Sequence, residues 1–235
     1  MSSPPEPPPD LSPEPPELHR RLLTDILAVG TDYPLALTGG YAAQAHGLVD
    51  RVSQGVDVAT ENPAGMADIA GTVRTGLEER GWVVRSLETD PLSARLIVAD
   101  PALGEACEVY VFKEVLWRPP VLTELGLTLS FEDLVGTRVR ALADRGLARD
   151  LIDVHAASEH WSHPELEELG RRHARDTLDL TDLQARLTGA DWIDDREFTA
   201  YGLDDRAVAE LRRWAQEWAD DIAERLIESS PPEEE

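Results

Sequence analysis

Cysteine and lysine are almost absent from the sequence. Cys107 is the only cysteine among 235 residues, so no intramolecular disulfide can form. This usage makes a cytoplasmic location the default expectation. Lys113 is the only lysine, and the other basic side chains are arginines.

Long apolar runs and an excess of positive charge are also missing. No apolar stretch approaches the ~18 residues that would cross a bilayer, and the N-terminus lacks the cationic and apolar regions of a signal peptide. Because 46 acidic residues stand against 22 basic ones, the formal net charge is −24. This balance excludes a polybasic nucleic-acid binder. It also argues against binding to an anionic membrane surface.

Proline and acidic residues dominate both ends of the chain. Roughly half of residues 1–17 are prolines, and the charged residues among them are all acidic. Such a segment cannot bury apolar surface and favours extended polyproline II. We therefore expect tails at 1–17 and 229–235, an α/β domain over 18–130 and a helical region over 131–228.

Hydrophobic periodicity predicts an α+β fold, because the expected strands lie within the first 130 residues and the rest of the chain is helical. The expected strands cover residues 35–37, 55–59, 83–87, 94–98 and 106–112, and the expected helices cover 18–29, 41–47, 64–80, 131–144, 150–160, 165–175, 180–187 and 204–227.

One stretch of the sequence combines features that suit a phosphate ligand. A short strand runs into Gly39–Gly40, and a helix follows directly. Paired glycines let backbone amides approach a ligand, and a helix N-terminus offers free donors and positive potential. About fifteen residues later a second strand places Gly55 and Asp57 on one face, because strand side chains alternate.

A larger set of residues extends this motif along the chain. It comprises Thr38-Gly39-Gly40, His46-Gly47-Leu48, Arg51 and Ser53, then Asp133-Leu134, Arg145, Arg149-Asp150 and Asp153. Together these residues resemble the AbiEii/AbiGii-type toxin family of the nucleotidyltransferase superfamily, over about residues 35–161. The resemblance implies a nucleotidyltransferase-like small mixed sheet with flanking helices, followed by a helical C-terminal part. It also implies transfer of a nucleoside monophosphate from an NTP to an RNA or protein hydroxyl, with Mg²⁺ as cofactor.

The same resemblance assigns roles to individual side chains. It implies that Asp57 and Glu108 hold the metal, and that Arg138 and Asp150 complete the catalytic set. The residues that it places around the nucleotide are Thr38, Gly39, Gly40, Ser53, Arg145 and Arg149.

Three positions depart from the family pattern. Gly55 stands where the first aspartate of an Asp-x-Asp pair is expected, Tyr110 where a third carboxylate is expected, and Arg138 where a lysine is expected. Two magnesium ions need several carboxylates, and losing such ligands typically costs ~10³-fold or more in rate. The sequence therefore predicts a weak or inactive relative, a pseudoenzyme.

Several alternatives remain open. The chain could be an active nucleotidyltransferase that uses Asp57 and Glu108, or a non-catalytic protein that binds a nucleotide or a partner. The expected partners are a nucleotide, tRNA and a cognate antitoxin. The acidic surface would also suit a cationic small molecule as acceptor.

Other reactive side chains carry weaker signals. Cys107 lies in an expected strand and is interpreted as a small core residue rather than a nucleophile. The spacing of His155, His160, His163 and His173 does not predict a zinc site. For His46 a capping or packing role is favoured over a nucleotide contact, and Trp214 and Trp218 share an apolar helical face that predicts core packing.

Overall fold

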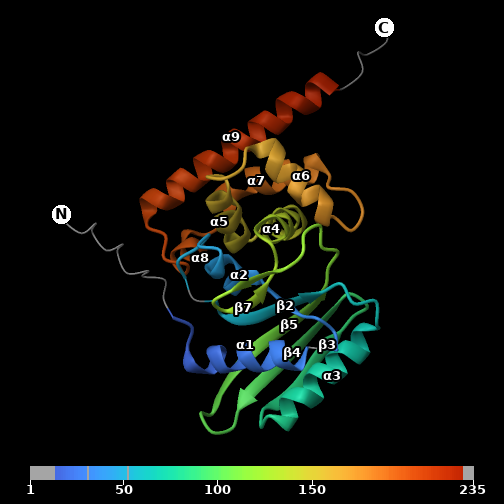
Figure 1. Ribbon diagram of the computed structural model, residues 1–235. Helices are drawn as coiled ribbons and strands as arrows, with labels where there is room; N and C mark the ends of the chain where they lie inside the picture. The colour runs from blue at the N-terminus through green and yellow to red at the C-terminus, as the bar shows by residue number, and fades with distance from the viewer. Residues whose placement is uncertain (1–13, 31, 52, 230–235) are drawn as a thin grey trace, which may run out of the picture.

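The computed structural model describes residues 14–30, 32–51 and 53–229. The rest of the two expected tails, residues 1–13 and 230–235, lies outside this range. Within the described residues the strands form one seven-stranded sheet, with the order β3-β4-β5-β2-β1-β7-β6. Helices cover both faces of this sheet, which confirms the α+β prediction (Figure 1).

The elements follow one another along the chain without a repeat. The strands are β1 (Ala36–Thr38), β2 (Gly55–Thr60), β3 (Val83–Thr89), β4 (Ser93–Asp100), β5 (Glu105–Lys113), β6 (Val121–Thr123) and β7 (Gly126–Thr128). The α-helices are α1 (Glu17–Val29), α2 (Gly39–Ala45), α3 (Met66–Glu79), α4 (Phe131–Arg145), α5 (Ala148–Ala157), α6 (His163–His173), α7 (Leu180–Thr188), α8 (Asp195–Thr199) and α9 (Asp205–Ser229), with a 3-10 turn, η1 (Gly189–Trp192), after α7.

The two faces of the sheet belong to different hydrophobic clusters. Val56 and Val58 of β2, with Val109 and Val111 of β5, pack against α1 and α3 on one face. On the opposite face Ala59 joins the core built by the C-terminal helices. Asp57 shares this second face with Ala59, because side chains alternate along a strand. Asp57 therefore lies on the face of β2 that is covered by the helical layer.

Helix α4 has defined ends that set the start of the helical layer. The Ser130 hydroxyl accepts a hydrogen bond from the Asp133 amide at 3.1 Å, which caps the N-terminus. At the other end Gly146 adopts φ +61°, a left-handed conformation that favours glycine. Gly146 thus ends α4 before α5 begins, as the sequence predicts.

Some short elements differ from the sequence-based prediction. The hairpin of β6 and β7 lies at one edge of the sheet, where no strands were expected. Each of its strands has three residues, too few for a period-two pattern to stand out. The 3-10 turn η1 and the five-residue α8 were also not predicted, because neither is long enough to show a helical period.

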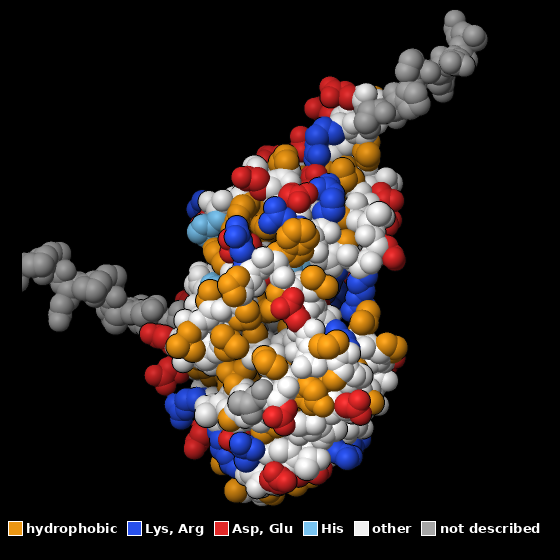
Figure 2. Space-filling view, turned by 45° about the vertical axis from the view of Figure 1, so that its right-hand side comes forward, with side chains coloured by type: hydrophobic (Ala, Val, Ile, Leu, Met, Phe, Trp, Pro, Cys, Tyr) orange, Lys and Arg blue, Asp and Glu red, His pale blue; other side chains and the backbone are white. Residues whose placement is uncertain are grey.

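The surface is mixed in character. Charged side chains of both signs are spread over the face shown in Figure 2, and hydrophobic side chains gather across its middle. None of the helices in the described residues combines the length and apolarity needed to cross a membrane.

A partly buried ion pair joins α6 to α9 in the helical layer. The Glu167 carboxylate accepts hydrogen bonds from the Arg225 guanidinium at 2.5 and 2.9 Å and from the Trp218 indole nitrogen at 3.0 Å. Trp218 is fully buried, which confirms the core packing predicted for this face. Burying a carboxylate is costly unless its charge is compensated.

Arg225→Met should therefore destabilise the protein by ~2–3 kcal/mol, less than for a fully buried pair because the Arg225 side chain is one-third exposed. Glu167→Gln should cost less, because the amide leaves no buried charge behind. Urea unfolding of both variants measures the difference, and a larger loss for Glu167→Gln would contradict this account.

Candidate functional site

The glycine pair lies where β1 meets α2, and neither glycine can be replaced without a clash. Gly39 has φ +67°, and a Cβ atom added there would lie 1.9 Å from Oδ2 of Asp57. A Cβ added at Gly40 would lie 2.5 Å from the hydroxyl oxygen of Ser53. The two glycines therefore allow the turn to sit directly against Asp57 and Ser53.

Strand pairing places the expected site residues side by side. Thr38 of β1 lies opposite Asp57, and on the other side of β2 Asp57 lies opposite Tyr110 of β5. Gly55 lies opposite Glu108. Asp57, Glu108 and Tyr110 thus share one face of adjacent strands, although Glu108 is diagonal to Asp57 rather than directly opposite it.

Asp57 is partly buried, and three arginines partly compensate the cost of burying its charge. Burial raises the pKa of the Asp57 carboxyl, and the positive charges of Arg138, Arg149 and Arg145, in that order of effect, lower it. These three residues are called the arginine cluster below. The cluster joins helices α4 and α5 to the face of the sheet that bears the glycine turn.

Two fully buried aspartates of α5 hold the arginine cluster in place. Asp150 accepts two hydrogen bonds from Arg145, both of 2.8 Å, and its Oδ1 lies 3.9 Å from Nε of Arg149. Asp153 lies 3.1 Å from Nε of Arg138. Paired contacts of this kind fix the orientation of a guanidinium as well as its position.

Asp153 also binds a cation from outside the cluster. The Arg51 guanidinium donates to Oδ1 of Asp153 at 2.8 Å. The same guanidinium lies 4.8 Å from the centre of the Tyr201 ring, between α8 and α9. Although Arg51 belongs to the motif quoted above, sequence reasoning gave it no role, and its link to Tyr201 spans 150 residues without a local signal.

The Glu108 carboxylate accepts hydrogen bonds from side chains of β4 and of its own strand, β5. Arg95 of β4 donates to its carboxylate at 2.7 and 3.3 Å, and the Tyr110 hydroxyl donates to it at 3.1 Å. The hydrogen bond from Arg95 is the main cause that lowers the pKa of Glu108. Arg95 was not identified from the sequence, because it lies opposite Tyr110 only through strand pairing.

The donor set does not match a two-metal site. Asp57 is the one carboxylate at the three strand positions where the family pattern expects acids, since Gly55 and Tyr110 supply none. Nearby positive charges from the arginine cluster would also oppose a second cation. Among the described residues, no three His, Cys, Asp or Glu side chains gather in a group that could hold a metal ion.

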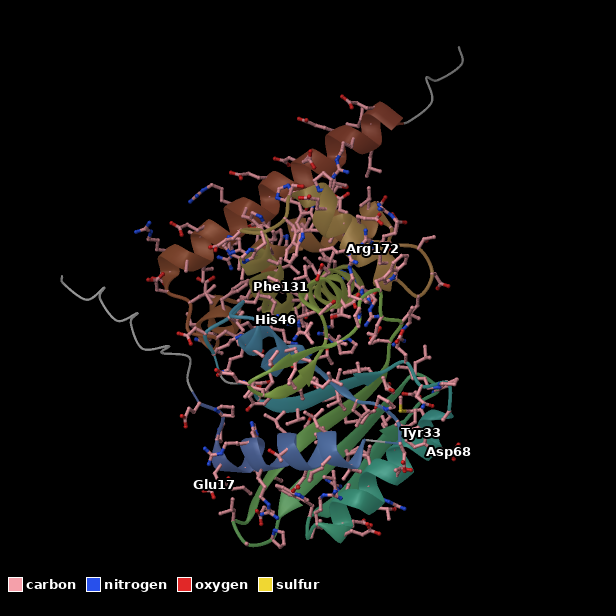
Figure 3. The ribbon with its side chains drawn as sticks, viewed as in Figure 1. Glu17, Tyr33, His46, Asp68, Phe131 and Arg172 are labelled. Carbon is pink, nitrogen blue, oxygen red and sulfur yellow. The ribbon has the colours of Figure 1, made fainter. Side chains whose placement is uncertain are left out.

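The remaining candidates have structural roles. Nε2 of His46 lies 2.7 Å from the Leu129 carbonyl oxygen, and its ring stacks on Phe131 at 5.1 Å (Figure 3). This is the packing role expected for His46. Cys107 is buried in β5, and burial raises the pKa of its thiol to about 11, so it is a core residue as predicted.

One protein-family model matches most of the chain. The model of the family described as "Nucleotidyl transferase AbiEii toxin, Type IV TA system" matches residues 21–233. No curated protein sequence matches the chain significantly.

Solved structures with the same fold share little sequence with the chain. MenT4, a nucleotidyltransferase toxin of Mycobacterium tuberculosis, is 18% identical with a TM-score of 0.58, and the match covers 87% of this chain and 82% of that one. JHP933 of Helicobacter pylori is 16% identical with a TM-score of 0.54, covering 92% and 97%. At this identity the likeness establishes the nucleotidyltransferase fold alone, and it confirms the fold expected from the sequence.

Gly39→Ala should destabilise the protein by ~2–4 kcal/mol, because it adds a clash with Asp57 to an unfavourable backbone conformation. A double-mutant cycle with Asp57→Gly separates the two causes, since that change removes the atoms the new Cβ would meet. We expect Gly39→Ala to cost about half as much in the Asp57→Gly background. Equal costs in both backgrounds would show that Asp57 does not constrain the turn.

Asp57→Asn should stabilise the protein at neutral pH. Because the pKa of Asp57 is higher in the folded than in the unfolded chain, ionised Asp57 opposes folding. This penalty is complete above the raised pKa and disappears as the pH falls toward the unfolded value. We expect the variant to melt ~2–4 °C higher at pH 7 and to lose this advantage in acid. A lower melting temperature at pH 7 would mean that attraction to the arginines outweighs burial.

Proposed function

The chain belongs to the AbiEii nucleotidyl transferase toxin family, and from that premise we propose that it binds a nucleoside triphosphate between the glycine turn and the arginine cluster. We further propose that nucleotidyl transfer is weak or absent. The observation that carries the proposal is the arginine cluster itself, which faces Asp57 from α4 and α5.

The charge of the site suits a triphosphate. Arg138, Arg145 and Arg149 bring three permanent positive charges to one side of the sheet, in a chain whose net charge is −24. Guanidinium groups bind phosphate oxygens through paired donors. Gly39 and Gly40 are themselves buried, and Asp57 and Ser53 fill the space where their Cβ atoms would be, so the phosphates would meet the turn through those side chains. Thr38 and Ser53 would supply hydroxyls at the edge of the site.

Weak transfer follows from the missing carboxylates. Mg²⁺ would find Asp57 but no acid at Gly55 or Tyr110. In the alternative of an active enzyme, Glu108 would have to exchange its hydrogen bonds with Arg95 for a metal ion. Asp150 is committed to Arg145, so it positions the arginine cluster and would reach a nucleoside only indirectly.

The biological setting is proposed from the family. A retained activity would transfer a nucleoside monophosphate to an RNA 3′ end, such as that of tRNA, or to a protein hydroxyl in the cytoplasm. A cognate antitoxin would then be the natural partner. A chain without activity would act as a nucleotide-binding or partner-binding regulator.

Calorimetry with ATP, GTP, CTP and UTP tests binding directly. We expect at least one NTP to bind with or without Mg²⁺, and Arg138→Gln to weaken that binding by about tenfold or more. Arg74→Gln, on the exposed surface of α3, is the matched control and should bind normally. Binding that requires Mg²⁺, or that tolerates Arg138→Gln, would contradict the proposal.

Restoring the family residues tests why transfer is weak. The variant Gly55→Asp/Tyr110→Asp/Arg138→Lys should gain at least about tenfold in transfer of labelled NTP to total tRNA over the parent. A Cβ atom at position 55 would lie 2.9 Å from the Glu108 carbonyl oxygen, so Tyr110→Asp/Arg138→Lys is made in parallel to avoid that contact. The triple variant with Asp57→Asn is the negative control. No gain in either restored variant would show that missing ligands do not limit the activity.

A further inference from the structure

The residue after the glycine pair reaches away from the proposed nucleotide site. Tyr41 is 1% exposed and belongs to the hydrophobic cluster formed with α1 and α3, whereas Ala42 and Ala43 belong to the cluster of the helical layer. The Tyr41 hydroxyl forms a buried hydrogen bond with Nδ1 of His19, on α1. One side chain therefore connects the glycine turn to a helix on the opposite face of the sheet (Figure 1).

The Tyr41 hydroxyl also lies near a second acceptor, the carbonyl oxygen of Ser53, at 3.5 Å. This distance is longer than the roughly 2.7–2.8 Å that is typical when a hydroxyl donates to an oxygen. A tyrosine hydroxyl carries one proton and can donate it to only one strong acceptor. The long distance to Ser53 therefore assigns this proton to the bond with His19, whose Nδ1 accepts it while the ring is neutral.

A proton on His19 reverses the direction of this bond. In the imidazolium both ring nitrogens carry a proton, so Nδ1 can only donate. The Tyr41 hydroxyl then accepts from His19, and its own proton needs another acceptor. Because a buried donor without a partner is costly, the hydroxyl proton turns to the Ser53 carbonyl oxygen, and that contact shortens.

Ser53 connects this change to the glycine turn. A Cβ atom added at Gly40 would lie 2.5 Å from Oγ of Ser53 and 3.5 Å from its Cα, so Ser53 packs directly on the turn. The Ser53 hydroxyl donates to the Gly55 carbonyl oxygen at 2.9 Å, at the start of the strand that bears Asp57. A movement of the Ser53 carbonyl toward Tyr41 therefore changes how Ser53 packs against Gly40.

The surroundings set when the proton arrives. Burial lowers the pKa of His19, and the carboxylate of Glu105 on β5 opposes this shift. The ring is therefore neutral at pH 7 and takes up a proton in acid. Burial raises the pKa of Tyr41, and Cys107 of β5 adds to this effect, so the hydroxyl keeps its proton over the same range.

We propose that His19 and Tyr41 form a proton-controlled switch beneath the glycine turn. In the neutral state the Tyr41 hydroxyl donates to His19, and in the protonated state it donates to the Ser53 carbonyl oxygen and moves Ser53 relative to Gly40. An effect on nucleotide binding rests on the proposed function, because Gly40 and Ser53 border that site, but the switch itself does not depend on it.

NMR of the full chain across pH tests the switch without a nucleotide. In the parent we expect the amide signals of Gly40 and Ser53 to shift with the same midpoint as the His19 ring. Tyr41→Phe removes the hydroxyl that connects them, so His19 should still titrate while this step disappears from both amides. The step should also be absent in His19→Gln, where no imidazole takes up the proton.

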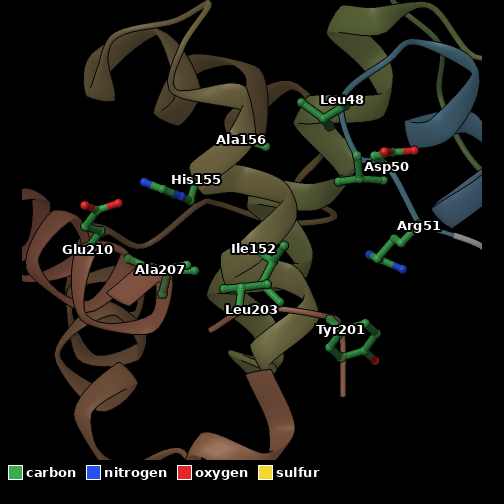
Figure 4. Close-up of a pocket in the computed structure, with 12 residues that line it drawn as sticks. Leu48, Asp50, Arg51, Ile152, His155, Ala156, Tyr201, Leu203, Ala207 and Glu210 are labelled. Carbon is green, nitrogen blue, oxygen red and sulfur yellow. The ribbon is translucent and has the colours of Figure 1, made fainter. Parts of the chain in front are cut away.

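Two controls separate the switch from general effects of acid. Tyr33→Phe removes a tyrosine hydroxyl that has no hydrogen-bond partner among the described residues, and it should keep the parent behaviour. His155 lies on α5, in the wall of a cavity of about 280 Å³ that neither His19 nor Tyr41 lines (Figure 4). Burial lowers the pKa of His155 as well, and its titration should be the same in all variants.

Two results would overturn the proposal. One is that the Gly40 and Ser53 amides keep the step in Tyr41→Phe. The other is that the His19 ring stays neutral until the chain unfolds in acid, which circular dichroism of the same samples detects.

Calorimetry then tests the coupling to the nucleotide site. We expect the NTP that binds at pH 7 to bind about threefold more weakly below the midpoint of His19 in Tyr33→Phe than in Tyr41→Phe, once each is compared with its own affinity at pH 7. Equal pH dependence in the two variants would contradict this coupling. If no NTP binds at all, the proposed function fails, and the NMR titration still decides the switch.

Discussion

The burial of two carboxylates on α5 is the constraint on which the rest of the site depends. Asp150 and Asp153 are fully buried, and an ionised carboxylate away from water is costly unless cations compensate it. The cations come from α4, from α5 itself and from the loop before β2. The same contacts therefore pack the helical layer on the sheet and bring positive charge to the glycine turn.

This arrangement gives one explanation for both the fold and the proposed chemistry. In the two-metal scheme, carboxylates on the strands hold cations that neutralise a triphosphate. Here Asp57 remains, while the strand positions at Gly55 and Tyr110 carry no acid. In our proposal, arginines held from the opposite side supply the positive charge instead. A guanidinium can bind phosphate but cannot generate a metal-bound nucleophile, which is why we propose binding with little turnover.

The sequence predicted the large elements well because their signals are local. Helix α4 and the stop at Gly146 follow from periodicity and a glycine, and the close approach at Gly39 follows from the glycine pair. The resemblance assigned Asp57 and the three arginines to one site, and in the structure the charges of all three arginines act on Asp57. The partners Arg95 and Tyr201 could not be predicted, because they meet Glu108 and Arg51 only through strand register and helix packing.

The titration of Asp57 in metal-free buffer tests the central claim most directly. Carbon-detected NMR of the Asp57 carboxyl gives its pKa in the parent chain, in Arg138→Gln and in the surface control Arg74→Gln. The account predicts that the pKa rises further in Arg138→Gln, because a charge that lowers it has been removed, and stays at the parent value in Arg74→Gln. An unchanged pKa in Arg138→Gln would mean that the arginine cluster does not act on the site.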